Sequence, residues 1–261
     1  MKEMIQELIE YRHLIYILAW RDIKIRYKQS VMGYLWAIFI PMVIVGAGII
    51  VKIGFSMISG DPLELSSIAS VTVKSLPWSF FIGSIKFATN SLVGNHNLVT
   101  KIYFPREVFP ISAVLASLVD FTLAAVTLSL ILVFAQIGIS VYILWVPILL
   151  LILVFLVTGL SLFLSCANLF FRDVKYIVDV LVTFAIFFTP VFYEASLFGK
   201  WETALLLNPI GSILENINYV VVMHTAPSYP WLAYSAAWGI GTFLLGWIVF
   251  HRSEAYFAEY I

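Results

Sequence analysis

The sequence is poor in charged residues and has almost no cysteine. Of its 261 residues, only 11% are Asp, Glu, Lys or Arg, whereas 62% are hydrophobic. Soluble domains contain about 25% charged residues, so this composition excludes an ordinary soluble domain and indicates a membrane protein. Cys166 is the single cysteine, which excludes a disulfide framework. The formal net charge of zero predicts no nucleic-acid partner, which would require a basic face.

The motifs of several enzyme classes are missing too. The sequence has no H-E-x-x-H pattern, no Cys/His cluster at metal-ligand spacing and no G-x-S-x-G elbow. Gly241 and Gly246 have the glycine spacing of a phosphate-binding loop, but Trp247 stands where that motif needs lysine. We therefore predict no enzyme, no metal site and no cofactor in this chain. Any transport work must be driven by a partner or by a gradient.

What the sequence does contain is a series of long apolar segments. A helix needs about 20 apolar residues to span a bilayer. Six segments are candidates: 31–57, 76–94, 111–135, 142–167, 177–193 and 231–250. The predicted fold class is an all-α polytopic membrane protein with six transmembrane helices, forming one domain over residues 1–261.

Lys and Arg are distributed unevenly around these segments. Most of them fall in residues 1–30, 95–110 and 168–176, with Arg252 in the tail. Because cytoplasmic loops carry an excess of Lys and Arg, we predict both termini in the cytoplasm and a location in the cytoplasmic (inner) membrane. The first apolar segment also begins too late for a cleavable signal peptide.

Residues 1–30 precede the first span and have a helical pattern. Apolar residues recur at steps of three and four, at Met4, Leu8, Tyr11, Ile15 and Leu18. This predicts an amphipathic helix in the cytoplasmic membrane interface, the alternative being a helix packed on protein.

A cluster of basic residues ends the same segment: Arg21, Lys24, Arg26 and Lys28. These residues orient the first span, and such clusters also attract anionic lipid head groups. The sequence alone does not decide between orienting the span and binding head groups.

Three charged residues inside predicted spans stand out: Lys52, Lys86 and Asp120. A charge in the membrane costs a few kcal/mol, so each is a functional candidate. Lys86 and Asp120 lie at similar depth in antiparallel spans, and we predict that they form a structural pair. A proton or ion relay is the alternative, but it needs further titratable groups in file.

Two connecting segments are more patterned than simple loops. Residues 95–110 combine an apolar edge of Leu98, Ile102 and Phe104 with two prolines, which predicts a short cytoplasmic helix that could serve a soluble partner as a lever. A passive loop is the alternative. Residues 194–230 hold two apolar pieces broken at Asn208-Pro209, and we predict two short helices that dip back from the outer face.

Aromatic residues are concentrated in the first, second and fifth spans. The set considered for a channel lining is Trp36, Phe39, Trp78, Phe81, Phe187, Phe188 and Phe192. An interfacial aromatic belt is the plain interpretation. The alternative is a conduit for sugars, because flat rings pack against their apolar C–H faces.

The order of these elements resembles the membrane subunits of type 2 ATP-binding-cassette exporters, in the branch that exports lipid-linked polysaccharides such as O-antigen, capsule and wall teichoic acid. The stretches that carry the resemblance are "LAWRDIKIRYKQSVMGYLWAIFIPM", "VTKIYFPREVFPI" and "NLFFRDVKYIVDVLVTFAIFFTPVFY", with "LLNPI" after them.

The resemblance implies a homodimer in contact with membrane lipids, associated with two copies of an ATPase subunit that holds the ATP and magnesium. The first, second and fifth spans would line a channel, residues 194–225 would form the external gate, and a lipid-linked polysaccharide would approach the basic cluster with its head group. Coupling to the ATPase would use Asn97, Leu98, Val99, Thr100, Lys101, Ile102, Tyr103 and Phe104.

Three other functions stay open at this point. An exporter of drugs or small lipids would have the same architecture. A membrane transferase acting on a lipid-linked sugar would need acidic or histidine residues that converge at one interface, and no inner loop supplies them. A gradient-driven transporter would need a file of titratable groups inside the membrane.

Overall fold

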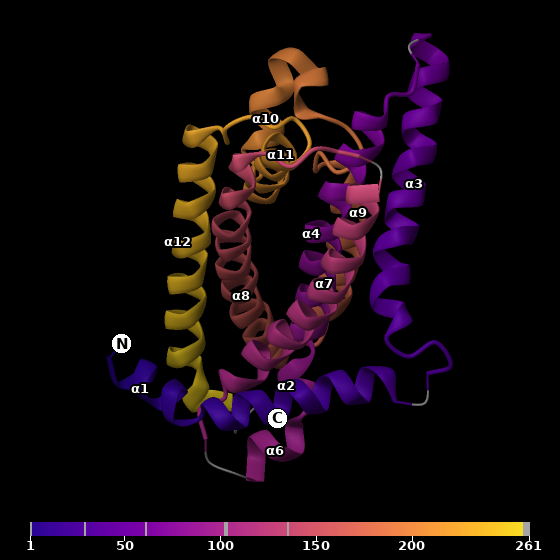
Figure 1. Ribbon diagram of the computed structural model, residues 1–261. Coiled ribbons are helices and arrows are strands. Elements are labelled where there is room, and N and C mark those ends of the chain that lie inside the picture. The colour runs from indigo at the N-terminus through magenta and orange to yellow at the C-terminus, as the bar shows by residue number, and fades with distance from the viewer. Residues whose placement is uncertain (1, 29, 61, 102–103, 135, 258–261) are drawn as a thin grey trace.

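The computed structural model describes residues 2–28, 30–60, 62–101, 104–134 and 136–257, and most of these residues are helical, with no strand among them (Figure 1). The α-helices are α1 (Lys2–Glu10), α2 (Arg12–Tyr27), α3 (Leu35–Ser59), α4 (Leu65–Thr89), α5 (Ser91–Gly94), α6 (His96–Lys101), α7 (Val108–Phe134), α8 (Val146–Phe170), α9 (Val174–Phe184), α10 (Glu202–Leu206), α11 (Pro209–Val221) and α12 (Tyr229–Ser253). Short 3₁₀ turns are η1 (Val141–Trp145), η2 (Ala185–Phe187), η3 (Ala195–Trp201) and η4 (Glu254–Tyr256).

Five helical stretches among the described residues are long and apolar enough to cross a membrane: Leu35–Ile58, Leu65–Thr89, Val108–Phe134, Val141–Phe170 and Tyr229–Tyr256. The predicted fifth span over 177–193 is not among these helices. There, α9 has 11 residues and passes into η2, and the chain then turns at Thr189 and Pro190. With 11 residues, α9 is too short to span as one helix, and Pro190, which has no N–H to donate, lies in the turn that follows.

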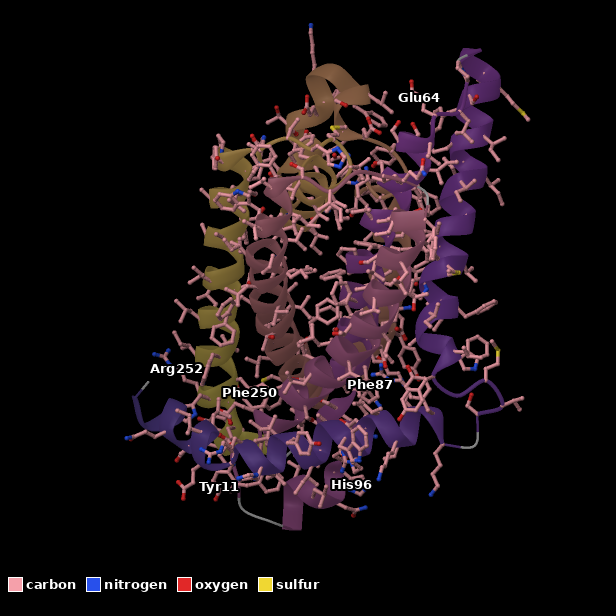
Figure 2. The ribbon with its side chains drawn as sticks, viewed as in Figure 1. Tyr11, Glu64, Phe87, His96, Phe250 and Arg252 are labelled. Carbon is pink, nitrogen blue, oxygen red and sulfur yellow. The ribbon has the colours of Figure 1, made fainter. Side chains whose placement is uncertain are left out.

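The long helices form an upright bundle with two distinct ends (Figure 1). At one end, hereafter the α2 end, α2 lies across the bundle and α6 extends beyond it. The last turns of α12 also lie at this end, where Phe250 and Arg252 mark them near α2 (Figure 2). At the other end, hereafter the α11 end, α10 and α11 cover the bundle.

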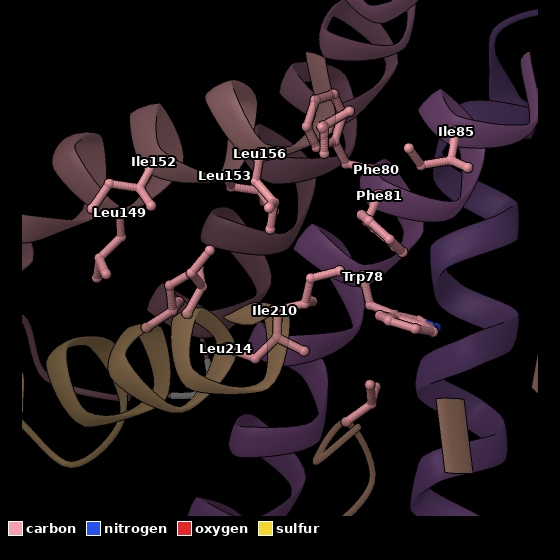
Figure 3. Packing of buried hydrophobic residues seen from close by; sticks show 14 of the residues in the cluster. Trp78, Phe80, Phe81, Ile85, Leu149, Ile152, Leu153, Leu156, Ile210 and Leu214 are labelled. Carbon is pink, nitrogen blue, oxygen red and sulfur yellow. The ribbon is translucent and has the colours of Figure 1, made fainter. Parts of the chain in front are cut away.

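The hydrophobic core lies between α4, α8 and α11 (Figure 3). α4 contributes Trp78, Phe80 and Phe81, which meet leucines and isoleucines of α8 and α11. α4 is therefore the most buried long helix, whereas α3 lies at the edge of the bundle and buries only 6% of its most apolar stretch against the chain. A helix that is apolar all round but not covered by its own chain must face lipid or another protein.

α8 and α12 pack backbone to backbone through glycines. A Cβ atom built on Gly246 would lie 2.2 Å from the carbonyl oxygen of Gly159. Small residues allow this close approach, which is a common way to join helices in membranes.

The predicted break at Asn208-Pro209 separates α10 from α11. The Asn208 side chain accepts a hydrogen bond from the Ile210 N–H at 3.2 Å and so caps α11, and it also donates to Thr189 Oγ1 at 3.0 Å. Pro209 fits the first helical position because that position needs no N–H donor. α11 is buried against α4, α8 and α12.

The N-terminal segment forms two helices that join at Tyr11, not one helix over 1–30. Leu8, Tyr11, Ile15 and Leu18 pack into a second hydrophobic cluster that includes Phe250, and the side chain of Met4 lies outside the described residues. Tyr16, Ile17 and Trp20 are exposed instead. One side of α2 therefore packs on protein, and other positions present apolar side chains outward.

Candidate functional site

The four basic residues at the end of α2 and just after it fall into two groups: two arginines that form ion pairs and two lysines that form none among the described residues. Arg26 forms an ion pair with Asp120 of α7, and its guanidinium lies 4.4 Å from the centre of the Phe87 ring. Arg21 pairs with the neighbouring Asp22 at 2.8 Å. Lys24 and Lys28 are exposed and have no ion pair with a described residue. The two lysines thus carry the outward positive charge.

The predicted pair between Lys86 and Asp120 is wrong. Asp120 is held by Arg26, whereas Lys86 Nζ lies 3.6 Å from Asp179 Oδ1 and donates to Thr183 Oγ1 at 3.2 Å. Sequence position gives the depth of a residue in a helix hairpin, but not its direction around the helix axis. Here Lys86 points toward α9 and Asp120 toward α2.

The ion pair of Arg26 and Asp120 lies at the wall of a cavity of about 300 Å³. Tyr27 also lines it, and burial, followed by the neighbouring Asp120 carboxylate, raises the pKa of Tyr27 above its ordinary range, so the phenol stays protonated. The rest of the wall comes from α3, α4 and α7: Trp36, Ala37, Ile40, Pro41, Leu76, Ser79, Phe80, Gly83, Ser117, Phe121 and Ala124. A largely apolar cavity with a charged, hydrogen-bonding patch suits an amphiphile.

A second, shallower groove of about 580 Å³ runs along the exposed side of α2. Its basic lining residues are Lys24, Lys28 and the Asp22-paired Arg21, and they lie beside the aromatic rings of Trp20, Tyr27 and Tyr34. Tyr27 lines both the groove and the cavity. Positive charge beside aromatic rings is typical of a surface that meets anionic lipid head groups at the membrane interface.

The ion pair of Lys86 and Asp179 points away from the core. Its side chains are 37% and 42% exposed, although both belong to apolar helices. Phe184, Phe187 and Phe188 of the same stretch are also exposed. Because charges in a membrane face a cavity or other protein instead of lipid, this surface of α4 and α9 is the candidate for a water-filled path or a subunit contact.

The aromatic residues considered for a channel lining differ in exposure: some face outward and others are buried in the core. Trp36, Phe39, Phe187 and Phe188 are exposed. For the other three, Trp78, Phe81 and Phe192, the prediction needs correction because the structure buries them to 9% exposure or less. Trp78 stacks on Phe81 in the core with 5.5 Å between ring centres, and Phe192 fills the space beside Gly48.

The segment expected to couple to a partner forms α6, a helix of six residues that follows the short α5. Val99 and Phe104 are buried in the second hydrophobic cluster and so anchor the segment instead of facing outward. Leu98 is partly buried against the same cluster, and Asn97 is exposed. Ile102 and Tyr103, and the side chains of Thr100 and Lys101, lie outside the described residues.

A buried ion pair near the α11 end was not predicted. The predicted spans 31–57 and 76–94 leave Lys74 in the loop between them, but α4 begins at Leu65 and Lys74 is fully buried, 3.3 Å from Glu215 of α11. Lys74 also donates to the Tyr193 carbonyl oxygen at 2.6 Å, and Glu215 accepts from the Ala195 N–H at 2.9 Å. The sequence feature that could have indicated this ion pair is Glu215, an acidic residue in an otherwise uncharged segment around α11.

Lys52, the remaining charge singled out inside a predicted span, has a partner near the same region. Its Nζ lies 3.6 Å from Glu194 Oε1, just before η3. Two lysines of α3 and α4 therefore hold the segment that leads from α9 into α10 and α11.

Comparisons with known proteins match this chain to one family model and to named relatives. Residues 13–222 match the family model of the ABC-2 type transporter. The chain is 26% identical over 251 residues to the O-antigen export system permease protein RfbA of Klebsiella pneumoniae, with 94% of each chain covered. It is 28% identical over 271 residues to the protein of the same name from Myxococcus xanthus, with 100% of each chain covered.

Proposed function

This chain belongs to the ABC-2 type transporter family and is a multi-pass membrane protein, and from that premise we propose that it is the permease subunit of a polysaccharide exporter. Its substrate is a lipid-linked polysaccharide, and ATP hydrolysis in a separate subunit drives export across the cytoplasmic membrane. The names of the curated relatives support the substrate class. The chain itself is not an enzyme in this proposal.

The observation that carries the proposal is the exposed polar and aromatic surface of α4 and α9. Lys86 and Asp179 cannot face lipid at low cost, and α3 is left nearly uncovered by its own chain. A second copy of the chain placed against this side covers α3 and encloses a path between the subunits. In this arrangement α9, η2 and residues 188–193 together form the sixth crossing. Exposed rings of Phe187 and Phe188 supply flat apolar surface for sugar rings.

The α2 end is cytoplasmic in this proposal. It carries most of the basic residues, as cytoplasmic segments do, and α6 extends beyond α2 where a soluble subunit can reach it (Figure 1). α6 is short and anchored by Val99, so a push on it is transmitted to the bundle. At the outer end, α10 and α11 form the gate as two short re-entrant helices.

Reconstitution tests the proposed function directly. Proteoliposomes with this chain and its ATPase subunit are expected to contain two copies of each subunit and to translocate a lipid-linked polysaccharide only with ATP. The chain alone is expected to hydrolyse no ATP and to move no polysaccharide. Robust translocation by the chain without an ATPase contradicts the proposal, and ATP-driven movement of a small lipid but not of the polysaccharide favours the small-lipid alternative.

We expect a bulky side chain on the exposed face of α6 to uncouple the subunits. Asn97→Trp is expected to lower polysaccharide export and co-purification of the ATPase subunit at least tenfold, because the large ring prevents close docking while the exposed position tolerates it in the folded chain. Thr203→Trp on α10, also exposed but at the opposite end, is the matched control for docking and is expected to retain co-purification of the ATPase subunit. Normal co-purification of Asn97→Trp rules out α6 as the docking site.

Lys24 and Lys28 are expected to contribute most of the affinity of α2 for anionic head groups. The double variant Lys24→Gln/Lys28→Gln loses about 1 kcal/mol per charge, which is about a 30-fold weaker affinity for a fluorescent polyprenyl diphosphate. Fluorescence anisotropy with the purified protein measures this affinity. Arg21→Gln serves as the comparison, because Asp22 already neutralises Arg21, and is expected to change it much less. Equal losses in both variants contradict the division of the basic cluster.

A further inference from the structure

Three potential metal ligands from distant parts of the sequence converge at the α2 end. Glu107 lies just before α7, and His251 and Glu254 lie in the last turns of α12 and in η4. One ligand atom from each residue lies within 4.8 Å of the others. His251 Nδ1 is 3.3 Å from Glu107 Oε1 and 3.9 Å from Glu254 Oε2.

Glu107 is the residue that points to a missing ligand. Its side chain is only 5% exposed, and Oε2 is buried with no hydrogen-bond partner among the described residues. A buried carboxylate oxygen without a partner is costly. A protonated His251 satisfies Oε1 of Glu107 but leaves Oε2 unpaired, whereas an ion bound by both oxygens of Glu107 would also engage Oε2.

The neighbouring groups leave Glu254 ready to bind a cation. Its Oε1 accepts a hydrogen bond from the Arg106 N–H at 3.0 Å, and its main-chain carbonyl oxygen accepts one from the Arg106 guanidinium at 3.0 Å. These contacts fix the residue, while Oε2 faces His251. Such outer contacts are what orient metal ligands in known sites.

We propose that Glu107, His251 and Glu254 bind a divalent transition-metal ion, Zn²⁺ or Mn²⁺. Metal–ligand bonds of about 2.0–2.1 Å in a tetrahedral site place ligand atoms roughly 3.3 Å apart. The distance from His251 to Glu107 is 3.3 Å, and the 3.9 Å from His251 to Glu254 must shorten when the ion binds. Imidazole favours Zn²⁺, and carboxylates suit Mn²⁺. Two carboxylates also balance the charge of a divalent ion.

The ion has a route to the site and a mechanical consequence there. The His251 side chain is 46% exposed, so an ion can enter from solvent at the α2 end and keep one water as a fourth ligand. When bound, it joins the start of α7 to the end of α12, which are otherwise linked here by Arg106 and Glu254. The bound ion thereby stabilises the chain close to α6, which ends at Lys101, five residues before Arg106.

The test uses the purified full-length chain without an affinity tag, stripped with EDTA and desalted. Zn²⁺ is titrated in competition with a chromophoric chelator, and the wild type is expected to bind one equivalent per chain. His251→Ala and Glu107→Gln are each expected to weaken this binding at least tenfold. His13→Ala, which removes an exposed histidine of α2, is the control and is expected to bind as the wild type does. Mn²⁺, followed by its electron paramagnetic resonance signal, provides the parallel measurement.

The outcomes are distinct even where a variant folds poorly. Glu107→Gln alters a buried position, whereas His251→Ala alters a half-exposed one, and size-exclusion chromatography shows which variants are folded. A folded His251→Ala that binds Zn²⁺ as tightly as the wild type overturns the proposal. So does a wild type that binds neither Zn²⁺ nor Mn²⁺ at micromolar concentrations. Neither result depends on which substrate the chain transports.

Discussion

Replacing Glu215 with alanine is expected to lower the free energy of unfolding by about 3–5 kcal/mol, the range for a buried ion pair that loses one partner. The Lys74 ammonium, which is fully buried, keeps only its hydrogen bond to the Tyr193 carbonyl oxygen. The Ala195 N–H also loses its acceptor. Unfolding of the purified chain in detergent, followed by tryptophan fluorescence, measures the change.

A double variant separates two contributions to the free energy of unfolding: the penalty of an unpaired buried charge and the net stabilisation by the ion pair. Lys74→Met combined with Glu215→Leu removes both charges and is expected to be less destabilised than the sum of the single variants, because replacing a buried pair by apolar residues is often nearly neutral. Lys52→Met is the matched comparison. It breaks a pair at 3.6 Å whose side chains are partly exposed, so a smaller loss is expected. Additive effects of the two single substitutions would show that Lys74 and Glu215 do not interact.

The contacts of this pair also matter for the proposed gate. Glu215 ties α11 to α4 and, through Ala195, to the start of η3. Loss of the pair therefore frees the outer end of the chain from its most buried helix. In the export assay we expect Glu215→Ala to lose activity together with stability.

Gly246→Ala is expected to destabilise the chain by about 3 kcal/mol, at the upper end of the range for overpacking. The added methyl would lie 2.2 Å from the Gly159 carbonyl oxygen, and main-chain atoms cannot rotate aside as a side chain can. α8 and α12 must therefore separate along their contact. The loss is measured by the same unfolding experiment.

Gly241→Ala on the same helix is the matched control. No atom lies within 4 Å of a Cβ at that position, so only the better helix propensity of alanine acts, worth up to about 1 kcal/mol in favour of the variant. The two substitutions change the same chemical group five residues apart. Equal stability of the two variants would mean that the close approach of α8 and α12 is absent in the membrane protein.

The sequence alone predicted the features that depend on local physics. The apolar segments gave an all-helical membrane protein because a bilayer accepts no unpaired backbone groups. The break at Asn208-Pro209 was predicted because proline cannot continue a helix, and the structure confirms it with Asn208 as the cap of α11. Pro190 gives a similar signal in 177–193, but Pro41 and Pro77 lie inside the continuous helices α3 and α4, so a proline by itself does not decide where a helix ends.

Only the tertiary structure decided which side chains meet. Arg26 and Asp120 are 94 residues apart, and His251 and Glu107 are 144 apart, so no local pattern records either contact. Burial of Trp78 and Phe81, in place of the predicted channel lining, has the same origin. Hydropathy determines that a helix lies in the membrane and how deep each residue sits. The direction in which a side chain points is set by how the helices pack on one another, and that direction decides whether a lysine or a tryptophan faces the core, a partner or water.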